Sequence, residues 1–342
     1  MTNHNHMSPL PTIIGRGYED VFIYPSYSEV LTRQDVDTTT VMEGLHSKIS
    51  VVSRVPVVAA NMDTVTESKM CSVLHKKRGW GALHRFMDVD LNVKEFLSVE
   101  SNSQETPHGF RCFVSVGATG DYQERAKRLY EAGARLFIID IAHGHSLVMK
   151  NALMWMRKTF GDNVFLVGGN VATPNAVVDV EDWGADAVKV GIGPGAVCTT
   201  KDVTGVTVPI FTAVQRCAFV ARGSIIADGG CRSYGDVAKA IGAGASMVMS
   251  GYFFAGTAET PSRAHLGDGK IMYRGMASRG AMEGYRSGSL PTAEGTSVIL
   301  EQKGSAGVVL DEIAGGLRSA YSYVGAKTTA EFQQKVVFGF RR

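Results

Sequence analysis

Several hallmarks of common protein classes are missing from this sequence. Its five cysteines are odd in number, widely spaced and never arranged as C-x-x-C, which argues against a disulfide framework or a zinc site and predicts a reducing compartment. The N-terminus lacks the cationic and apolar segments of a secretory signal, and no apolar run is long enough to span a membrane. We therefore expect a cytoplasmic protein.

An excess of charge of one sign is also missing. The 35 Lys and Arg residues nearly balance the 33 Asp and Glu residues, for a net charge of +2, and no basic block is present. This pattern argues against nucleic acid or a membrane as a partner, so any anionic ligand has to be bound locally. Hydrophobic residues at 44% suffice for a large core, and 342 residues allow one large domain or two ordinary ones.

The chain does contain a repeated strand–helix unit. Eight apolar runs rich in β-branched residues each end in a polar or glycine-rich tip. The runs occupy residues 57–62, 81–86, 112–117, 136–141, 164–168, 187–191, 224–228 and 247–251. Continuous apolar runs are typical of parallel strands buried on both faces, so eight of them alternating with helices predict a (β/α)8 TIM barrel. A doubly wound open sheet is the alternative, although no G-x-G-x-x-G motif follows an early strand.

Helices and boundaries follow from the same pattern. Helical spacing occurs at residues 66–78, 121–132, 145–159, 173–183, 212–222 and 234–243. We predict a single barrel domain without an inserted regulatory domain: a lead-in at 1–56, the barrel core at 57–257, an active-site flap at 258–303 and a closing segment at 304–342. The flap is assigned because a long irregular stretch after the eighth strand is typical of a functional loop.

One cysteine, Cys198, lies in a glycine-rich loop. Residues 189–200 read Lys-Val-Gly-Ile-Gly-Pro-Gly-Ala-Val-Cys-Thr-Thr, and the three glycines permit close approach of a ligand to Cys198. A thiol in such a loop is suited to act as a nucleophile. The alternative is that Cys198 is a small buried residue beside a tight turn. Cys231 is the rival nucleophile, but it lacks the hydroxyl residues that directly follow Cys198.

Polar residues gather at the tips of other predicted strands. In TIM barrels the carboxyl ends of the strands carry the chemistry, and the last two strands commonly bind phosphate through backbone N–H groups. Residues 228–230 (Asp-Gly-Gly) and Gly251 stand at these two tips. Asp228 would repel phosphate but suits ribose hydroxyls, so the two tips indicate a nucleoside monophosphate; a simple turn is the alternative. Asp140 and His143 are candidates for an acid–base pair; a role in orienting a ligand or in core hydrogen bonding is the alternative.

Seven motifs occur in one order along nearly the whole chain. They are Ala59-Ala-Asn-Met-Asp-Thr-Val65, Leu83-His-Arg85, Gly169-Asn-Val171, Gly191-Ile-Gly-Pro-Gly-Ala-Val-Cys-Thr-Thr200, Asp228-Gly-Gly230, Tyr273-Arg-Gly-Met276 and Gly315-Gly-Leu-Arg-Ser319. On these motifs the chain resembles the IMP dehydrogenase and GMP reductase family. The resemblance implies a TIM barrel with a catalytic cysteine, a nicotinamide cofactor and, usually, a homotetramer.

Other features resemble the GMP reductase branch of that family. The short span between Phe86 and Cys112 leaves no room for the regulatory domain pair that the dehydrogenases generally insert. The flap reads Tyr285-Arg286 rather than the Arg-Tyr pair with which dehydrogenases activate water, and it ends in Glu294-Gly295.

Three departures from the reductase pattern keep a second function open. They are Lys201, residues 290–293 and the Leu-His-Arg at 83–85. The alternative is an IMP dehydrogenase that lacks the regulatory insert and oxidises IMP to XMP with NAD.

The resemblance implies NADPH-dependent reduction of GMP to IMP and ammonia through a covalent thioimidate between Cys198 and purine C2. The catalytic residues it implies are Cys198, Thr200 and Glu294. The substrate-binding residues are Asp228, Gly229, Gly230, Gly251, Tyr252, Gly275, Met276, Ala277, Glu294 and Gly295. The cofactor-binding residues are Arg85, Asp140, Ile141, Ala142, Ile192, Gly193 and Met276. A monovalent cation, K+, is assigned to the carbonyl groups of Gly193, Gly195 and Cys198.

Overall fold

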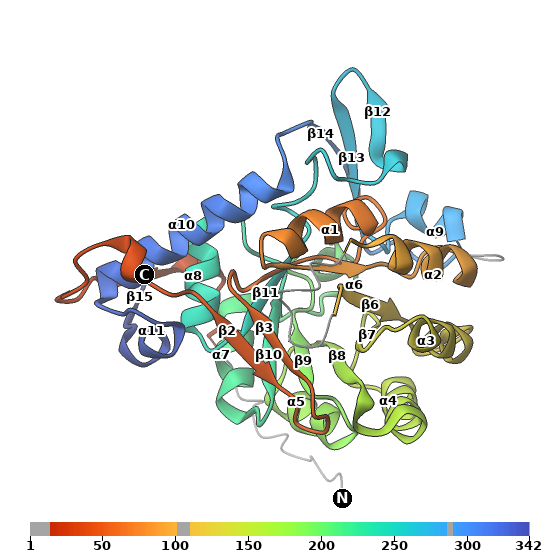
Figure 1. Ribbon diagram of the computed structural model, residues 1–342, viewed down its shortest axis with the longest axis horizontal. Helices are drawn as coiled ribbons and strands as arrows, with labels where there is room; N and C mark the ends of the chain where they lie inside the picture. The colour runs from red at the N-terminus through yellow and green to blue at the C-terminus, as the bar shows by residue number, and fades with distance from the viewer. Residues whose placement is uncertain (1–13, 101–109, 286–289, 342) are drawn as a thin grey trace, which may run out of the picture.

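Eight parallel strands close into a barrel in this computed structural model, which describes residues 14–100, 110–285 and 290–341 (Figure 1). The barrel strands are β4 (Val57–Ala59), β5 (Trp80–Leu83), β6 (Phe113–Val116), β7 (Leu136–Asp140), β8 (Phe165–Val171), β9 (Ala187–Val190), β10 (Ser224–Asp228) and β11 (Met247–Ser250). Strand β11 pairs with β4 and thereby closes the ring. The predicted TIM barrel is confirmed, and the open-sheet alternative is wrong.

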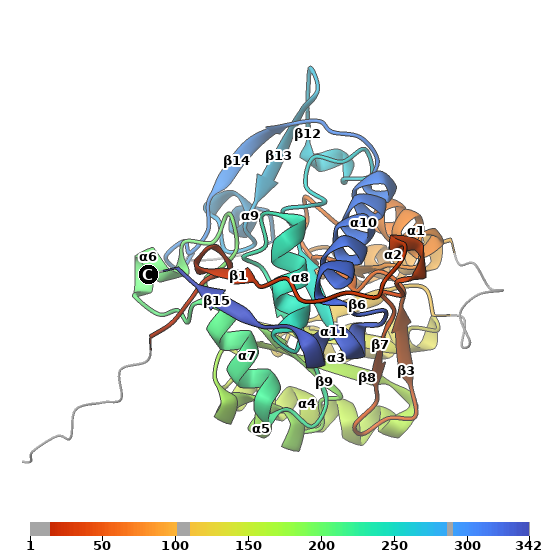
Figure 2. The ribbon, with the colours of Figure 1, turned by 90° about the vertical axis from the view of Figure 1, so that its left-hand side faces the viewer.

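Helices cover the outside of the barrel (Figures 1 and 2). They are α1 (Ser68–Lys76), α2 (Val89–Ser98), α3 (Tyr122–Glu131), α4 (Leu147–Phe160), α5 (Pro174–Asp182), α7 (Ile210–Val220), α8 (Tyr234–Gly242) and α10 (Ala306–Val324). The long helix α10 packs between α8 and α1, at the seam where the last strand meets the first. All six helices that the spacing predicted are present.

Helix α2 was not predicted, because its apolar pattern is weak. Only Asn92 and Phe96 are buried along it. A cap signal was available: the Asp88 side chain accepts a hydrogen bond from the backbone N–H of Leu91 at 2.7 Å. An aspartate in this position satisfies one of the free N–H groups at a helix start.

Side chains along the barrel strands alternate between two apolar layers. The inward layer consists mainly of Val58, Ala82, Phe113, Leu136, Ile138, Phe165, Val167, Ala187, Ile226, Met247 and Met249. The other layer packs against the helices. Because strand side chains alternate with a period of two, Asp140, Lys189 and Asp228 also face the interior, each two residues beyond an inward apolar one.

The N-terminal part of the chain closes one end of the barrel. Strands β2 (Thr40–Glu43) and β3 (Ser50–Ser53) form an antiparallel hairpin, and Met42 and Val51 join the inward apolar layer. Strand β1 (Val21–Ile23) pairs with β15 (Phe338–Phe340) from the other end of the chain, which follows α11 (Thr329–Lys335).

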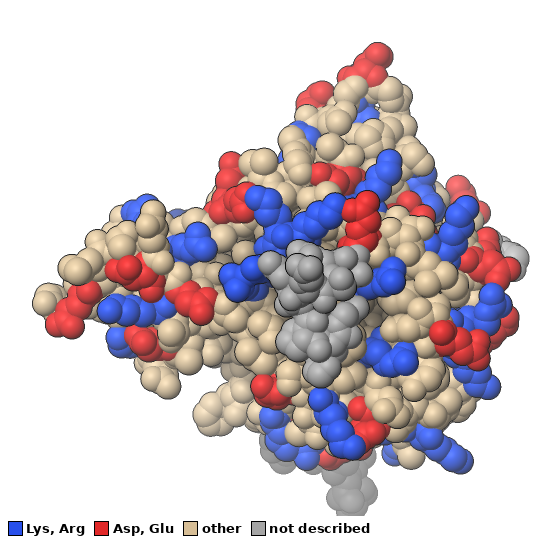
Figure 3. Space-filling model, viewed as in Figure 1, with Lys and Arg blue, Asp and Glu red and all other residues tan. Residues whose placement is uncertain are grey.

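A three-stranded antiparallel sheet projects from the barrel (Figures 1 and 2). It consists of β12 (His265–Gly267), β13 (Lys270–Arg274) and β14 (Ser297–Glu301), with α9 (Arg279–Tyr285) between the last two. The sequence analysis predicted none of these strands. β12 and nearly all of β14 are exposed, so they show no alternation of apolar and polar residues. β13 does alternate, with Ile271 and Tyr273 buried, and was missed. The face shown in Figure 3 carries charges of both signs, interspersed. Within the described ranges, no helix is long and apolar enough to cross a membrane.

Candidate active site

A cleft of about 390 Å³ opens at the carboxyl ends of the barrel strands. Apart from Gly295, every residue predicted for catalysis, substrate, cofactor or cation lines it: Arg85, Asp140, Ile141, Ala142, Ile192, Gly193, Gly195, Cys198, Thr200, Asp228, Gly229, Gly230, Gly251, Tyr252, Gly275, Met276, Ala277 and Glu294. Segments more than 200 residues apart in sequence therefore meet around one space. The cleft is large enough for a small-molecule ligand.

The loop after β9 presents Cys198 to this cleft. Cys198 is partly exposed, and its Sγ lies 3.2 Å from Thr200 Oγ1. Gly191 and Gly193 adopt φ values of 151° and 85°, which residues with a Cβ rarely do. A Cβ on Gly191 would collide with the carbonyl oxygen of Asp228, so the loop leaves β9 in close contact with β10.

The rival nucleophile Cys231 is far less available. Cys231 is only 2% exposed. Burial, and then the nearby charge of Asp236, raise the pKa of the Cys231 thiol well above its usual value. Since the thiolate is the nucleophilic form, the structure favours Cys198.

Backbone pairing holds Cys198 and Glu294 side by side. Cys198 forms an antiparallel bridge with Gly295, which also bridges to Ser278. The N–H of Thr199 donates to the carbonyl of Glu294 at 2.9 Å, and Thr296 N–H donates to the carbonyl of Val197 at the same distance. Main-chain hydrogen bonds thus hold the backbone of the Glu294 segment against the Cys198 loop, and both residues line the cleft.

Gly295 lies in the wall behind the cleft. A Cβ there would approach Ser278 N to 3.0 Å and the Val197 carbonyl oxygen to 3.3 Å. Its role is one of spacing: it lets the flap and the cysteine loop pack closely.

A charged network forms the floor of the cleft. Lys189 Nζ lies 2.9 Å from Asp140 Oδ1 and also contacts Asp228 Oδ2 and Asn170 Oδ1. Burial opposes ionisation of Asp140, but the charge and hydrogen bond of Lys189, with a hydrogen bond from Asn61, outweigh it and hold the Asp140 pKa below its ordinary value. Burial likewise opposes the charge on Lys189, and the two carboxylates outweigh it, so the Lys189 pKa is raised. Lys189 and Asp140 therefore remain charged at neutral pH.

This arrangement does not bear out an acid–base pair between Asp140 and His143. The partners of Asp140 are Lys189 and Asn61, whose Nδ2 donates to Asp140 Oδ2 at 2.8 Å. His143 is exposed and does not line the cleft. Among the described residues, no group of three or more His, Cys, Asp and Glu side chains could hold a metal ion.

The part of the cleft beyond Asp228 is lined by the glycines that follow β10 and by the buried side chain of Tyr273. Gly229 and Gly230 have φ values of 82° and 80°, the left-handed conformation that glycine favours. Tyr273 on β13 is 4% exposed. Burial, and then the charge of Asp228, raise the Tyr273 pKa, so the phenol is a neutral hydrogen-bond donor.

Several residues of the cleft received no role from the sequence, namely Asn61, Asn170, Lys189, Arg232, Tyr273 and Tyr285, although Asn61 and Asn170 stand at tips of predicted strands. A signal existed for Lys189: it interrupts the apolar run of β9 at an inward position. A buried lysine in such a run requires charged partners. Tyr273 lay in a quoted motif but on a strand that the pattern did not predict.

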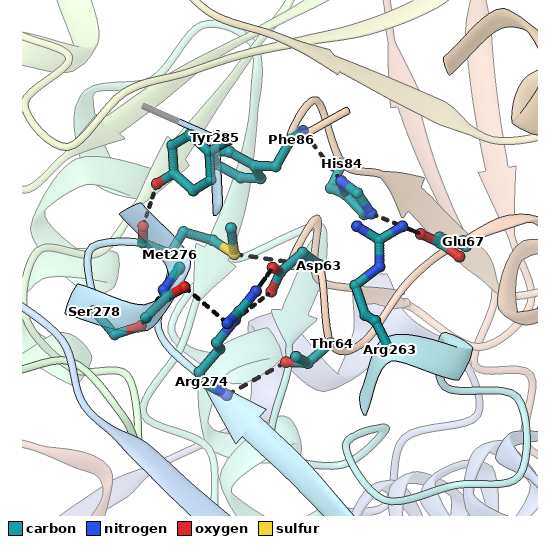
Figure 4. Close-up of polar contacts among 12 residues, drawn as sticks. Asp63, Thr64, Glu67, His84, Phe86, Arg263, Arg274, Met276, Ser278 and Tyr285 are labelled. Atoms are coloured by element: carbon teal, nitrogen blue, oxygen red, sulfur yellow. Dashed lines mark hydrogen bonds and ion pairs between the residues drawn. The ribbon is translucent and has the colours of Figure 1, made fainter. Parts of the chain in front are cut away.

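Ion pairs anchor the segment predicted as a flap to the barrel (Figure 4). Arg274, at the end of β13, binds the carboxylate of Asp63, with Nε 3.3 Å from Oδ1 and 3.2 Å from Oδ2. The backbone N–H of Asp63 lies 3.3 Å from Met276 Sδ, and Tyr285 Oη donates to the Met276 carbonyl. The cleft-lining segment around Met276 is therefore held from both sides.

A second anchor lies beside the first. Arg263 and the buried His84 share the carboxylate of Glu67, with His84 Nε2 3.1 Å from Glu67 Oε1 (Figure 4). Burial alone would raise the Glu67 pKa, but these partners outweigh it, and the pKa is lowered.

Replacing Arg274 with methionine is expected to loosen the flap. Asp63 is 2% exposed, and leaving a buried carboxylate without its partner costs about 3–5 kcal/mol. We expect faster proteolysis within residues 275–295, measured by limited digestion and mass spectrometry. Arg279→Met is the matched control, because Arg279 is 77% exposed and its ion pair with Glu283 is a surface one. Equal cleavage rates in the two variants would contradict the anchoring role.

Comparison with known proteins matches the chain to one family. A family model described as the IMP dehydrogenase / GMP reductase domain covers residues 15–341. GMP reductase of Vibrio vulnificus (strain YJ016) is 37% identical over 94% of this chain and 93% of its own length. GMP reductase 2 of Mus musculus is 36% identical over 94% and 92%, respectively. Inosine-5'-monophosphate dehydrogenase of Cryptosporidium parvum is 35% identical over 94% and 91%. Both branches thus resemble the chain to nearly the same degree.

Proposed function

The chain belongs to the IMP dehydrogenase / GMP reductase family, and on that basis we propose that it is a GMP reductase that converts GMP to IMP and ammonia with NADPH. The observation that carries the proposal is the pairing of the Cys198 loop with the Glu294 segment across one cleft. Expulsion of an amine requires a nucleophile and an acid at one site, and this backbone pairing brings the segments that carry Cys198 and Glu294 to the same cleft.

Cys198 supplies the nucleophile. Its thiolate attacks C2 of the purine, so that a C2–S bond forms, the C2–N bond breaks, and the amine leaves as ammonia after taking up a proton. Thr200 and Glu294 are the proposed proton donors, since Thr200 Oγ1 already contacts Cys198 Sγ. The reduced nicotinamide, when bound, supplies the hydride that replaces the amine. The C2–S bond then breaks and returns the thiolate.

We assign the glycine-rich end of the cleft to the mononucleotide. Asp228 accepts hydrogen bonds from the ribose, and Gly230 and Gly251 offer backbone N–H groups to the phosphate, in the place where TIM barrels bind it. The N–H of Gly229 instead donates to the Met249 carbonyl at 3.1 Å, so Gly229 contributes to the turn. Tyr273 adds a phenolic donor. On the flap, residues 275–277 and Glu294 hold the base, since they line the cleft in the part of the flap that pairs with the Cys198 loop.

The dinucleotide is assigned to the other end. Asp140, Ile141 and Ala142 lie at the end of β7, and Arg85 stands beside them with its guanidinium 4.8 Å from the Phe86 ring centroid. The charge of Arg85 adds to the electrostatic support of Asp140. An arginine and an ionised carboxylate together suit phosphate and ribose groups.

A monovalent cation, K+, is proposed at the carbonyl groups of Gly193, Gly195 and Cys198. Hard cations prefer oxygen ligands. The Gly195 carbonyl accepts the Cys198 N–H at 3.1 Å, which leaves its second lone pair for a cation. A higher thermal unfolding midpoint in KCl than in LiCl at equal ionic strength would support this site; equal midpoints would count against it.

We also propose that the protein is a homotetramer and that it is located in the cytoplasm. All five cysteines are free, as expected in a reducing compartment. The tetramer rests on family membership, and light scattering of the purified protein tests it.

IMP dehydrogenase is the second candidate, because the Cryptosporidium parvum enzyme is nearly as similar as the reductases. Absorbance of the reduced nicotinamide decides between them. Loss of NADPH with GMP, and no NADH formation from IMP and NAD, is the expected result. The reverse pattern would assign the chain to the dehydrogenase branch.

Replacing Glu294 with glutamine is expected to slow turnover by about 10²- to 10⁴-fold, the usual contribution of a general acid. The amide keeps the size of the side chain but cannot donate the proton. Stopped-flow measurement of NADPH oxidation gives the rate, and GMP affinity is measured separately. Glu301→Gln, an exposed glutamate on β14, is the matched control. An unchanged rate in the Glu294 variant would remove this residue from the mechanism.

A further inference from the structure

A lysine is buried at the floor of the cleft between two carboxylates. Lys189 is 2% exposed, and it stands on β9 between the β8 and β10 neighbours of that strand. In the barrel register Asp140 on β7 is level with Gly169 on β8, which is level with Lys189. All three positions therefore belong to one inward-facing layer.

Gly169 makes the contact between Lys189 and Asp140 possible. A Cβ on Gly169 would lie 2.6 Å from Lys189 Cβ and 2.8 Å from the Lys189 carbonyl oxygen. The missing side chain leaves a gap on β8, and the lysine reaches across it to a carboxylate two strands away.

The ammonium group has a full set of acceptors. Its three N–H donors are matched by Asp140 Oδ1 at 2.9 Å, Asp228 Oδ2 and Asn170 Oδ1. Asn170 Nδ2 in turn donates to Asp228 Oδ2 at 2.8 Å, and Asn61 Nδ2 to Asp140 Oδ2 at 2.8 Å. No donor of Lys189 is left over for a ligand, which argues for an indirect role.

The two carboxylates, by contrast, are open to the cleft. The Asp140 side chain is 24% exposed and that of Asp228 19%. Under the proposed function, Asp228 serves the mononucleotide and Asp140 the dinucleotide. One ammonium thus supports an acceptor in each half of the cleft.

Resting on the proposed function, we propose that Lys189 is a positioning residue that holds Asp228 and Asp140 in place for the two nucleotides. Without its charge, two carboxylates would face each other across a buried gap. They would then move apart or share a proton. Either response disturbs both nucleotide subsites at once.

Titration calorimetry tests this with GMP and, separately, with NADP+. We expect Lys189→Met to weaken each nucleotide at least about tenfold, and Lys189→Arg, which keeps the charge, to weaken each less. Arg157→Met is the matched control, because it also breaks an ion pair with a buried carboxylate, that of Asp186. Asp186 directly precedes β9 and therefore lies at the end of the barrel opposite the cleft. Circular dichroism verifies that each variant is folded.

A double variant separates positioning from general stability. In Lys189→Met/Asp140→Asn the repelling carboxylate is gone, so GMP affinity is expected to recover at least about threefold relative to Lys189→Met, and the double variant also folds more readily. The inference is overturned if Lys189→Met binds both nucleotides normally, if only one is weakened, or if the double variant binds GMP no better. Wild-type protein that binds neither nucleotide contradicts the proposed function itself.

Discussion

Replacing Cys198 with serine is expected to reduce turnover by at least about 10³-fold, the scale seen when a covalent nucleophile is removed. The hydroxyl is a far weaker nucleophile than a thiolate, and the Thr200 side chain that contacts residue 198 is itself a hydroxyl and cannot serve as its base. Nucleotide binding should persist, because the proposed contacts to the ribose and phosphate come from residues 228–230 and Tyr273. NADPH oxidation and calorimetry measure the two quantities.

Cys217→Ala is the control for Cys198→Ser. Cys217 is fully buried on α7, away from the cleft, and burial raises its pKa to about 12. Its variant is expected to turn over at a near-normal rate. Mass spectrometry of a quenched reaction should place the purine adduct on Cys198, and an adduct on Cys231 or on no residue would refute the proposed chemistry.

Replacing Gly191 with alanine is expected to cause a large loss of stability, at least about 3 kcal/mol. Two costs combine there: the φ of 151°, which disfavours any side chain, and a Cβ that would collide with the backbone of Asp228. The clash lies between the start of the Cys198 loop and the end of β10, so activity should fall with stability. The midpoint of urea unfolding measures the loss.

Gly205→Ala separates these two costs. Gly205 also has a positive φ, 73°, but nothing lies within 4 Å of the position of its Cβ. Alanine there should cost only about 1 kcal/mol, the price of the left-handed backbone alone. Similar losses in both variants would mean that the contact with Asp228 is not what makes glycine necessary at 191.

The barrel strands were predictable because each is buried on both faces and therefore appears as a continuous apolar run. Such a run can be recognised from a few consecutive residues, without knowledge of the fold. Helix α2 and strands β12 and β14 were not predictable in this way. Helix α2 buries only two side chains, and strands β12 and β14 are largely exposed. None of the three therefore shows the periodicity of apolar residues on which such predictions depend.

The residues of the candidate site likewise fall into those that local sequence identifies and those that it does not. Cys198, Asp228 and their glycines were identified from the sequence, because a turn needs its glycines close by in the chain. The flap residues Glu294 and Met276 were identified through family motifs. Their position beside Cys198 depends on main-chain pairing between segments nearly 100 residues apart.

Local order along the chain was thus sufficient for the barrel and for the nucleophile, because strand burial and glycine turns are short-range effects. The folded barrel was needed to show that Lys189 joins Asp140 and Asp228, and that Arg274 binds Asp63. The sequence does not show which charged residues pair across strands, because the register of the closed sheet determines which residues lie next to each other.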